Sequence, residues 1–171
     1  MDELNRFERV FADLEARIDA EERSDRLAQV PDLMHESYAD HGLVERVAGL
    51  LGTRIEVTVQ GHVFTGSLVD QGEGWLALET PARLLVALRA VQLLRVPVRG
   101  RVPADLLSAL SLASPLRELS RRRVPVRIAL VGGLVVEGSI AAVGGDYMQL
   151  RAADHHQVIP LPAVDFVQEL L

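Results

Sequence analysis

The chain has 171 residues, of which 49% are hydrophobic and 25% are charged, a balance typical of a globular protein. It contains no cysteine, which excludes disulfide bonds, thiolate metal sites and cysteine nucleophiles. No apolar run approaches the roughly eighteen residues that cross a bilayer, and the acidic start is unlike a signal peptide, so we expect a cytoplasmic protein without a membrane partner.

The net charge of −6 is unevenly distributed along the chain. Residues 1–40 carry 12 acidic and 5 basic side chains, whereas residues 41–171 carry 12 acidic and 13 basic ones. Within the second part, the segment 95–127 holds eight arginines: Arg95, Arg99, Arg101, Arg117, Arg121, Arg122, Arg123 and Arg127. The sequence therefore predicts an acidic head followed by an arginine-rich segment.

Residues 1–30 predict an acidic amphipathic helix. Its apolar residues recur at alternating spacings of three and four, which places them on one face: Leu4, Phe7, Phe11, Leu14 and Ile18. This face either packs on the chain's own body or on a second copy, or it docks on another protein. Pro31 and the polar residues after it predict a linker over 31–42.

An internal repeat of about seventy residues organises the rest of the chain. Gly66-Ser67-Leu68 matches Gly138-Ser139-Ile140 at an offset of 72, and Trp75 matches Tyr147 at the same offset. The offset is 71 before these strings and 73 after them, where residues 85–91 match residues 158–164. Because the one-residue changes fall in predicted turns, the pattern indicates a duplicated structural unit.

Each copy of the repeat predicts a short helix followed by five strands. Ile55, Val57 and Val59 alternate with polar residues, which is typical of a strand with one buried face. A glycine inside the second strand, Gly66 or Gly138, indicates the bend that a very small barrel needs. The predicted fold is therefore mostly β with an N-terminal α-helix. It comprises two tandem five-stranded small barrels, over 43–96 and 116–171, joined by a helical connection over 97–115.

These units resemble the Sm-like family of small RNA-binding barrels, although other five-stranded barrels, such as the PRC and SH3-like types, share similar strings. The likeness spans residues 43–94 and 116–171 and depends on three short motifs: Leu51-Gly52-Thr53-Arg54-Ile55-Glu56-Val57, the pair Gly61 and Gly66, and Leu88-Arg89-Ala90-Val91. The resemblance implies pairing between barrels through their fourth and fifth strands, commonly in rings. The two fused barrels would pair with each other, with further copies, or both.

The same resemblance implies a base pocket made by an asparagine after the second strand and an arginine-glycine pair before the fifth. Only Asp70 and Arg89 of the first copy match as a residual pocket, and the second copy keeps neither. The sequence therefore departs from the family at the positions that would bind RNA.

Other chemical motifs are weak. The string Gly72-x-Gly74-x-x-Ala77 joins two strands, whereas a dinucleotide fingerprint needs a strand-to-helix turn. The neighbouring His155 and His156 point to opposite faces of a strand, so we expect an exposed hairpin tip and not a metal site. Trp75 and Tyr147 either cap the cores or provide a surface on which bases stack. We predict no catalytic residue, no cofactor and no metal.

Two functions are consistent with these patterns. The first is a non-catalytic protein-interaction or assembly module, which self-associates or binds another protein through barrel edges and the N-terminal helix. The second is RNA or DNA binding through the arginine-rich segment. The residues that would contact nucleic acid, or alternatively an acidic partner, are Arg95, Arg99, Arg101, Arg121, Arg122 and Arg123.

Overall fold

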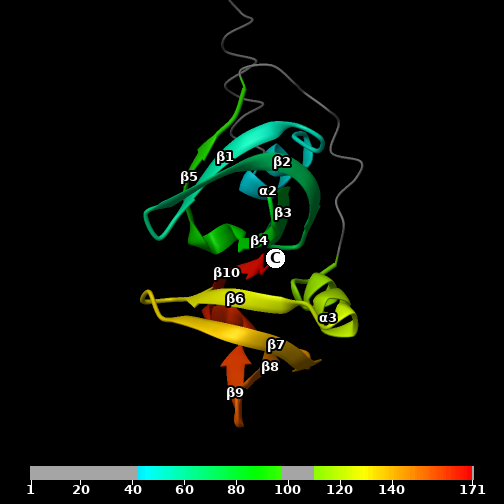
Figure 1. The fold of residues 1–171 in the computed structure, drawn as a ribbon. Coiled ribbons are helices and arrows are strands. Elements are labelled where there is room, and N and C mark those ends of the chain that lie inside the picture. The colour runs from blue at the N-terminus through cyan, green and yellow to red at the C-terminus, as the bar shows by residue number, and fades with distance from the viewer. Residues whose placement is uncertain (1–41, 98–109, 171) are drawn as a thin grey trace, which may run out of the picture. The chain divides into compact units, whose positions relative to one another are not determined.

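The computed structural model describes residues 42–97 and 110–170 (Figure 1). The predicted N-terminal helix with its docking face, almost all of the linker 31–42, and Arg99 and Arg101 lie outside the described residues. Residues Leu43–Leu171 form one compact unit. No helix in the described ranges is long and apolar enough to cross a bilayer.

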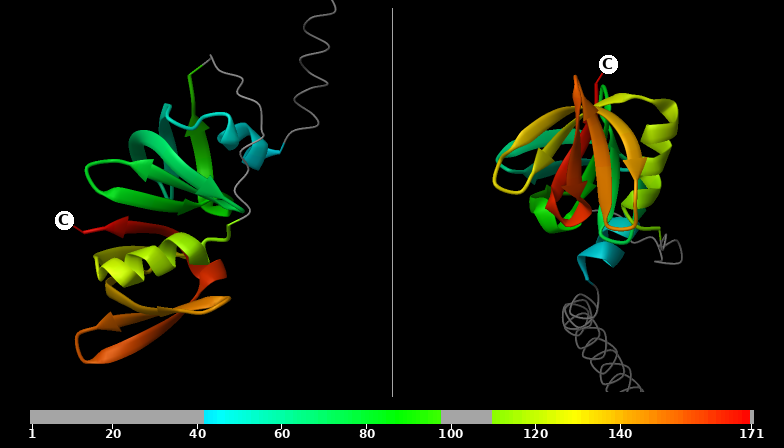
Figure 2. Two further views of the ribbon diagram at one scale, coloured as in Figure 1. Left: turned by 90° about the vertical axis from the view of Figure 1, so that its right-hand side faces the viewer. Right: turned by 90° about the horizontal axis from the view of Figure 1, so that it is seen from below.

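The described residues form two modules with the same order of elements, which confirms the mostly β class. The first module consists of α2 (Leu43–Ala48), β1 (Arg54–Val59), β2 (His62–Gly72), β3 (Trp75–Glu79), β4 (Arg83–Ala87), a 3-10 turn (Leu88–Ala90) and β5 (Val91–Arg95). The second module consists of α3 (Ala113–Arg122), β6 (Pro125–Leu130), β7 (Val135–Val143), β8 (Tyr147–Ala152), β9 (His155–Pro160), a 3-10 turn (Leu161–Ala163) and β10 (Val164–Glu169). The helix α3 packs beside β7 (Figures 1 and 2).

All ten strands belong to one open antiparallel sheet, with the order β5-β1-β2-β3-β4-β10-β6-β7-β8-β9. The prediction of two closed barrels is therefore wrong. Within the first module β4 does not pair with β5, because β4 forms its outer ladder with β10 of the second module. In Figure 1 β10 accordingly lies between the strands of the first module above and β6 below. One such ladder satisfies the backbone groups of two edges at once.

The glycines inside β2 and β7 allow a close approach of neighbouring backbone. A Cβ atom at Gly66 would overlap the carbonyl oxygen of Glu79, and one at Gly138 would overlap that of Arg151. The pairing of β2 with β3 has a register shift, a β-bulge, between Leu68 and Asp70. The pairing of β7 with β8 has the equivalent shift between Ile140 and Ala142. These features bend both modules at the same place.

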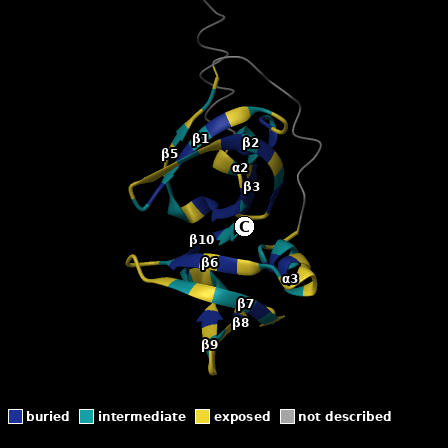
Figure 3. Ribbon diagram, in the orientation of Figure 1, coloured by how far each residue is buried: buried dark blue, intermediate teal, exposed yellow. Residues whose placement is uncertain are grey.

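Two hydrophobic cores lie on opposite faces of the sheet. Successive residues of a strand point to opposite faces, and in β4 Leu84 and Val86 belong to the first core while Leu85 belongs to the second. Each core also receives side chains from the other module: Phe166 enters the first core, and Trp75 enters the second. The central strands are consequently buried on both faces, whereas the hairpin end of β9 is exposed (Figure 3).

Candidate interaction interface

The β4–β10 ladder joins the two modules, and we call it the inner junction. Its register places Val86 opposite Phe166, Leu85 opposite Val167, and Leu84 opposite Gln168. Phe166 is 5% exposed, and its ring meets that of Phe64 edge-on, with centroids 5.1 Å apart. Leu85 is buried in the second core. Each module thus contributes large apolar side chains of this region to the core of the other.

Trp75 strengthens the inner junction from β3. Its side chain is buried in the second core, and its indole N–H donates to the carbonyl oxygen of Leu110 over 2.8 Å. The ring is therefore a core residue and offers no open face to a base. Its repeat equivalent, Tyr147, is 40% exposed at the start of β8.

A polar network crosses the inner junction around Asp165, which is buried. Arg89 donates from Nη1 to Oδ1 of Asp165 over 2.9 Å and from Nη2 to the carbonyl oxygen of Val164 over 2.5 Å. Gln60 donates from Nε2 to Oδ2 of Asp165 over 2.6 Å and to the carbonyl oxygen of Leu130 over 2.7 Å. Both carboxylate oxygens of Asp165 thus accept charge-assisted hydrogen bonds from side chains of the first module.

The structure gives Asp70 and Arg89, the predicted residual pocket, different partners. Arg89 belongs to the inner junction, whereas Asp70 forms an ion pair with Arg83, with 3.5 Å between Nη2 and Oδ2. Arg89 does not line the cleft to which Asp70 contributes. The two side chains therefore do not form a common pocket.

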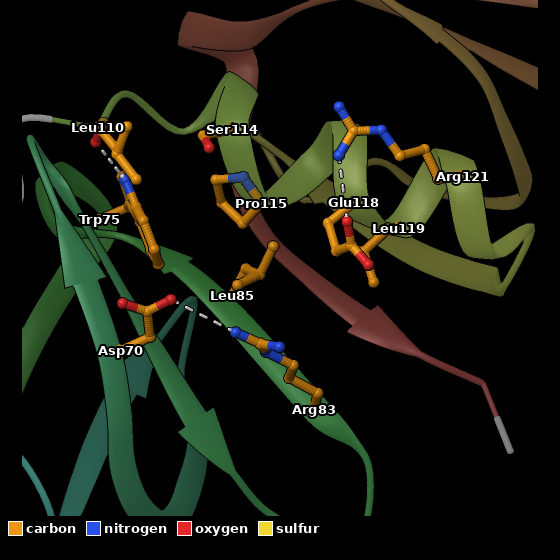
Figure 4. A pocket seen from close by; sticks show the side chains of 10 residues that line it. All are labelled: Asp70, Trp75, Arg83, Leu85, Leu110, Ser114, Pro115, Glu118, Leu119 and Arg121. Atoms are coloured by element: carbon orange, nitrogen blue, oxygen red, sulfur yellow. Dashed lines mark hydrogen bonds and ion pairs between the residues drawn. The ribbon is translucent and has the colours of Figure 1, made fainter.

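That cleft, of about 300 Å³, lies between the β2–β4 region and α3 (Figure 4). The described residues that line it are Asp70, Trp75, Arg83, Leu85, Leu110, Ser114, Pro115, Glu118, Leu119 and Arg121. Its charges are balanced in pairs, because Asp70 binds Arg83 and Glu118 binds Arg121 at 3.3 Å. A cleft with balanced charges provides little attraction for a polyanion.

The arginines predicted to contact nucleic acid or an acidic partner lie on two elements. Arg95, on β5, forms an ion pair with Glu56. Arg121, Arg122 and Arg123 lie at the end of α3, where Arg122 binds Glu169 at 3.0 Å and Arg123 ends the helix in the left-handed conformation. Three of these four arginines are therefore paired with acids of the same chain.

The histidine pair lies at the exposed β8–β9 hairpin. The His155 ring contacts the Asp154 carboxylate at 3.0 Å, and this hydrogen bond lowers the pKa of Asp154. Nowhere in the described ranges do three or more His, Cys, Asp or Glu side chains cluster in a way that could hold a metal ion.

The outer edges of the sheet, β5 and β9, each pair on one side only within the described residues. Both expose a large apolar side chain: Leu93 on β5 is 46% exposed, and Val158 on β9 is 63% exposed. At the offset of 73, Leu93 is the repeat equivalent of Phe166, and Val158 is the equivalent of Leu85. The outer edges therefore display the counterparts of the two side chains that the inner junction buries.

Sequence reasoning identified barrel edges in general but missed this correspondence. A usable signal was present in the strand sequences: Leu84 to Ala87 is a continuous apolar run, as expected for a strand buried on both faces. The equivalent residues 157–160 start with the polar Gln157 and end with Pro160, and a proline in a strand is typical of an edge.

A scan of protein-family models and a search of curated proteins found no family and no protein that match this chain.

Proposed function

We propose that the protein is a non-catalytic assembly module that associates head-to-tail with further copies of itself, β9 of one copy pairing with β5 of the next. The observation that supports this proposal is the inner junction. There, the chain already joins the fourth strand of one module to the fifth strand of the other. The remaining fourth and fifth strands, β9 and β5, are the two outer edges.

The register of the proposed ladder follows from the inner junction and the 73-residue offset. Leu93 of one copy would lie opposite Ile159 of the next, and Leu94 opposite Val158. Leu93 would then enter the second core of the neighbour, as Phe166 enters the first core. Val158 would enter the neighbour's first core, as Leu85 enters the second. Both apolar side chains would leave water, which stabilises association.

The prolines of the second module are compatible with this ladder. Pro160 lacks the N–H group that a paired strand can donate. Its repeat equivalent is Ala87, which lies one residue beyond the last paired residue of β4, Val86. Pro160 would therefore lie outside the ladder, and residues 157–159 would make the backbone hydrogen bonds.

The proposed interface joins two different surfaces, so it is heterologous. Heterologous interfaces propagate into closed rings or open filaments, whereas an isologous interface stops at a dimer. Each copy offers one β5 and one β9, so one interface type is sufficient for the whole assembly.

Nucleic-acid binding through the arginine-rich segment has weaker support. Arg95, Arg121 and Arg122 each form an ion pair with an acid of their own chain, which reduces the positive charge available to phosphates. A titration with single-stranded RNA at two salt concentrations tests it, and salt-sensitive binding that is lost on removing these arginines would favour it.

Sedimentation velocity of the full chain tests the assembly proposal. The wild-type mass should rise with concentration, whereas Leu93→Asp and Val158→Asp should each be monomeric, because each places an unpaired charge in the proposed interface. An equimolar mixture of the two variants should form a dimer and nothing larger, because it contains one intact β9 edge and one intact β5 edge. A monomeric wild type at every concentration would contradict the proposal.

The control variant is Val135→Asp, which makes the same change at an exposed position on the interior strand β7. It should associate like the wild type. Deletion of residues 1–30 distinguishes association through the edges from association through the predicted N-terminal helix. If association is lost with this deletion and survives in Leu93→Asp and Val158→Asp, the helix and not the edges joins the copies.

A further inference from the structure

We propose that Arg89 and Asp165 form a selection pair that decides which strand edges pair inside one chain and which remain for a second copy. The proposal rests on the head-to-tail association above. Each chain has two fourth strands, β4 and β9, and two fifth strands, β5 and β10. Four combinations of a fourth with a fifth strand are therefore conceivable, and the chain closes one of them internally, β4 with β10.

The selecting positions are equivalent in the two modules and differ in chemistry. At the offset of 73, the residue equivalent to Arg89 is Pro162, and the residue equivalent to Asp165 is Gln92. Gln60, the second donor to Asp165, aligns with Val131 at the offset of 71. The second module therefore lacks both side chains that bind Asp165.

These differences penalise one wrong pairing. If β10 paired with β9 of another copy, Asp165 would face Pro162 and Val131, neither of which has a side-chain donor. Burying a carboxylate without a partner is strongly unfavourable, as is breaking a buried ion pair by removal of one partner. In the proposed ladder between β9 and β5, Pro162 faces the uncharged Gln92, so no charge is left unpaired.

Gln92 is suited to a free edge. It is exposed, and its side-chain oxygen accepts a hydrogen bond from the backbone N–H of Gly61 over 2.8 Å. Its neutral amide tolerates either water or a partner, whereas Asp165 requires Arg89 and Gln60. The charge of Asp165 thus favours pairing of β10 with β4 and leaves β9 to pair with β5 of the next copy. The specificity comes from making the wrong pairing unfavourable.

Moving the acid to the outer edge tests the selection pair. In the full chain, Gln92→Asp should raise the dissociation constant of self-association more than about tenfold, because the new carboxylate would face Pro162. The control variant is Gln92→Asn, because asparagine has the shape of aspartate without its charge. Its dissociation constant should stay within about threefold of the wild-type value. The double variant Gln92→Asp with Pro162→Arg reproduces the inner pair and should restore association to the wild-type level or beyond.

Gln92 and Pro162 are both exposed, so these variants should fold like the wild type. Equal dissociation constants for Gln92→Asp and Gln92→Asn in a chain that associates would overturn the selection pair while leaving the proposed function intact. A wild type that never associates would instead contradict the proposed function. The selection pair then still predicts stronger association for the double variant than for Gln92→Asp alone, and equal behaviour would overturn it as well.

Discussion

The inner junction and the outer edges consist of equivalent strands of the repeat, which are paired and buried in the first case and exposed in the second. In β4, residues 84–87 are all buried, because one face lies on the first core and the other on the second. In β9, Ile159 is buried and Val158 is exposed. The backbone geometry is alike, so the difference comes from what covers each strand. Burial on both faces requires an apolar run such as residues 84–87, whereas the face of β9 that carries Val158 is uncovered in the single chain.

The two fifth strands, β10 and β5, show the same contrast in burial, and they also differ in charge. Phe166 and Asp165 of β10 are both buried at the inner junction, and Leu93 and Gln92 of β5 are both exposed. A carboxylate is tolerated inside because Arg89 and Gln60 bind it. The comparison teaches that a buried edge strand can contain a charge where donors of the same chain bind it, whereas the equivalent position of the exposed edge is neutral.

The largest expected effect is the difference in stability between equivalent substitutions in β4 and β9. Leu85→Asp should lower the free energy of unfolding by about 4 kcal/mol, because it buries an unpaired charge in the second core. The equivalent change Val158→Asp should alter it by less than about 0.5 kcal/mol, because that side chain is exposed in the single chain. Urea denaturation at low protein concentration measures both, and similar losses would contradict the described difference in burial.

A second effect should be equal in the two modules. Gly66→Ala and Gly138→Ala should each lower the free energy of unfolding by about 3 kcal/mol, because the new methyl group would overlap a neighbouring carbonyl oxygen. Gly145→Ala is the matched control, since a Cβ there meets no atom within 4 Å, and it should be nearly neutral. Thermal denaturation checks the three variants. A large loss at only one of the two strand glycines would show that the modules are not bent alike.

The smallest of these effects probes the polar network. Arg89→Ala should lower the free energy of unfolding by about 2 kcal/mol, less than for a fully buried pair because Arg89 is 42% exposed. Adding Asp165→Asn should recover part of this loss, because the orphaned charge is removed. The control Arg127→Ala breaks an exposed ion pair with Glu137 and should change stability by less than about 0.5 kcal/mol. A double-mutant cycle without coupling between positions 89 and 165 would contradict the assigned contact.

Much of the local structure could be predicted from the sequence. The strand that contains Ile55, Val57 and Val59 was evident from its alternation, and the structure shows it as β1. The short helix predicted before the strands of the second copy is observed as α3. Such features depend on neighbours along the chain, and the residues themselves carry that information.

The candidate interface could be predicted only in outline. Arg89 was singled out as a remnant of a base pocket, and the structure places it against Asp165, 76 residues away. Nothing in the local sequence of either residue indicates the other, because an ion pair across a sheet has no fixed spacing. The contrast between the exposed Leu93 and Val158 and their buried equivalents likewise follows only from the tertiary structure.

The sequence by itself determined that one strand-rich unit occurs twice, with a bend at Gly66 and Gly138, because side-chain periodicity and glycine placement are local properties. The tertiary structure alone decided that the two units share one open sheet instead of closing separately. The physical reason is that backbone hydrogen-bonding groups at a strand edge are alike at every residue but proline. The choice of partner for such an edge depends on side chains brought together from distant parts of the chain, here Leu85, Phe166, Arg89 and Asp165.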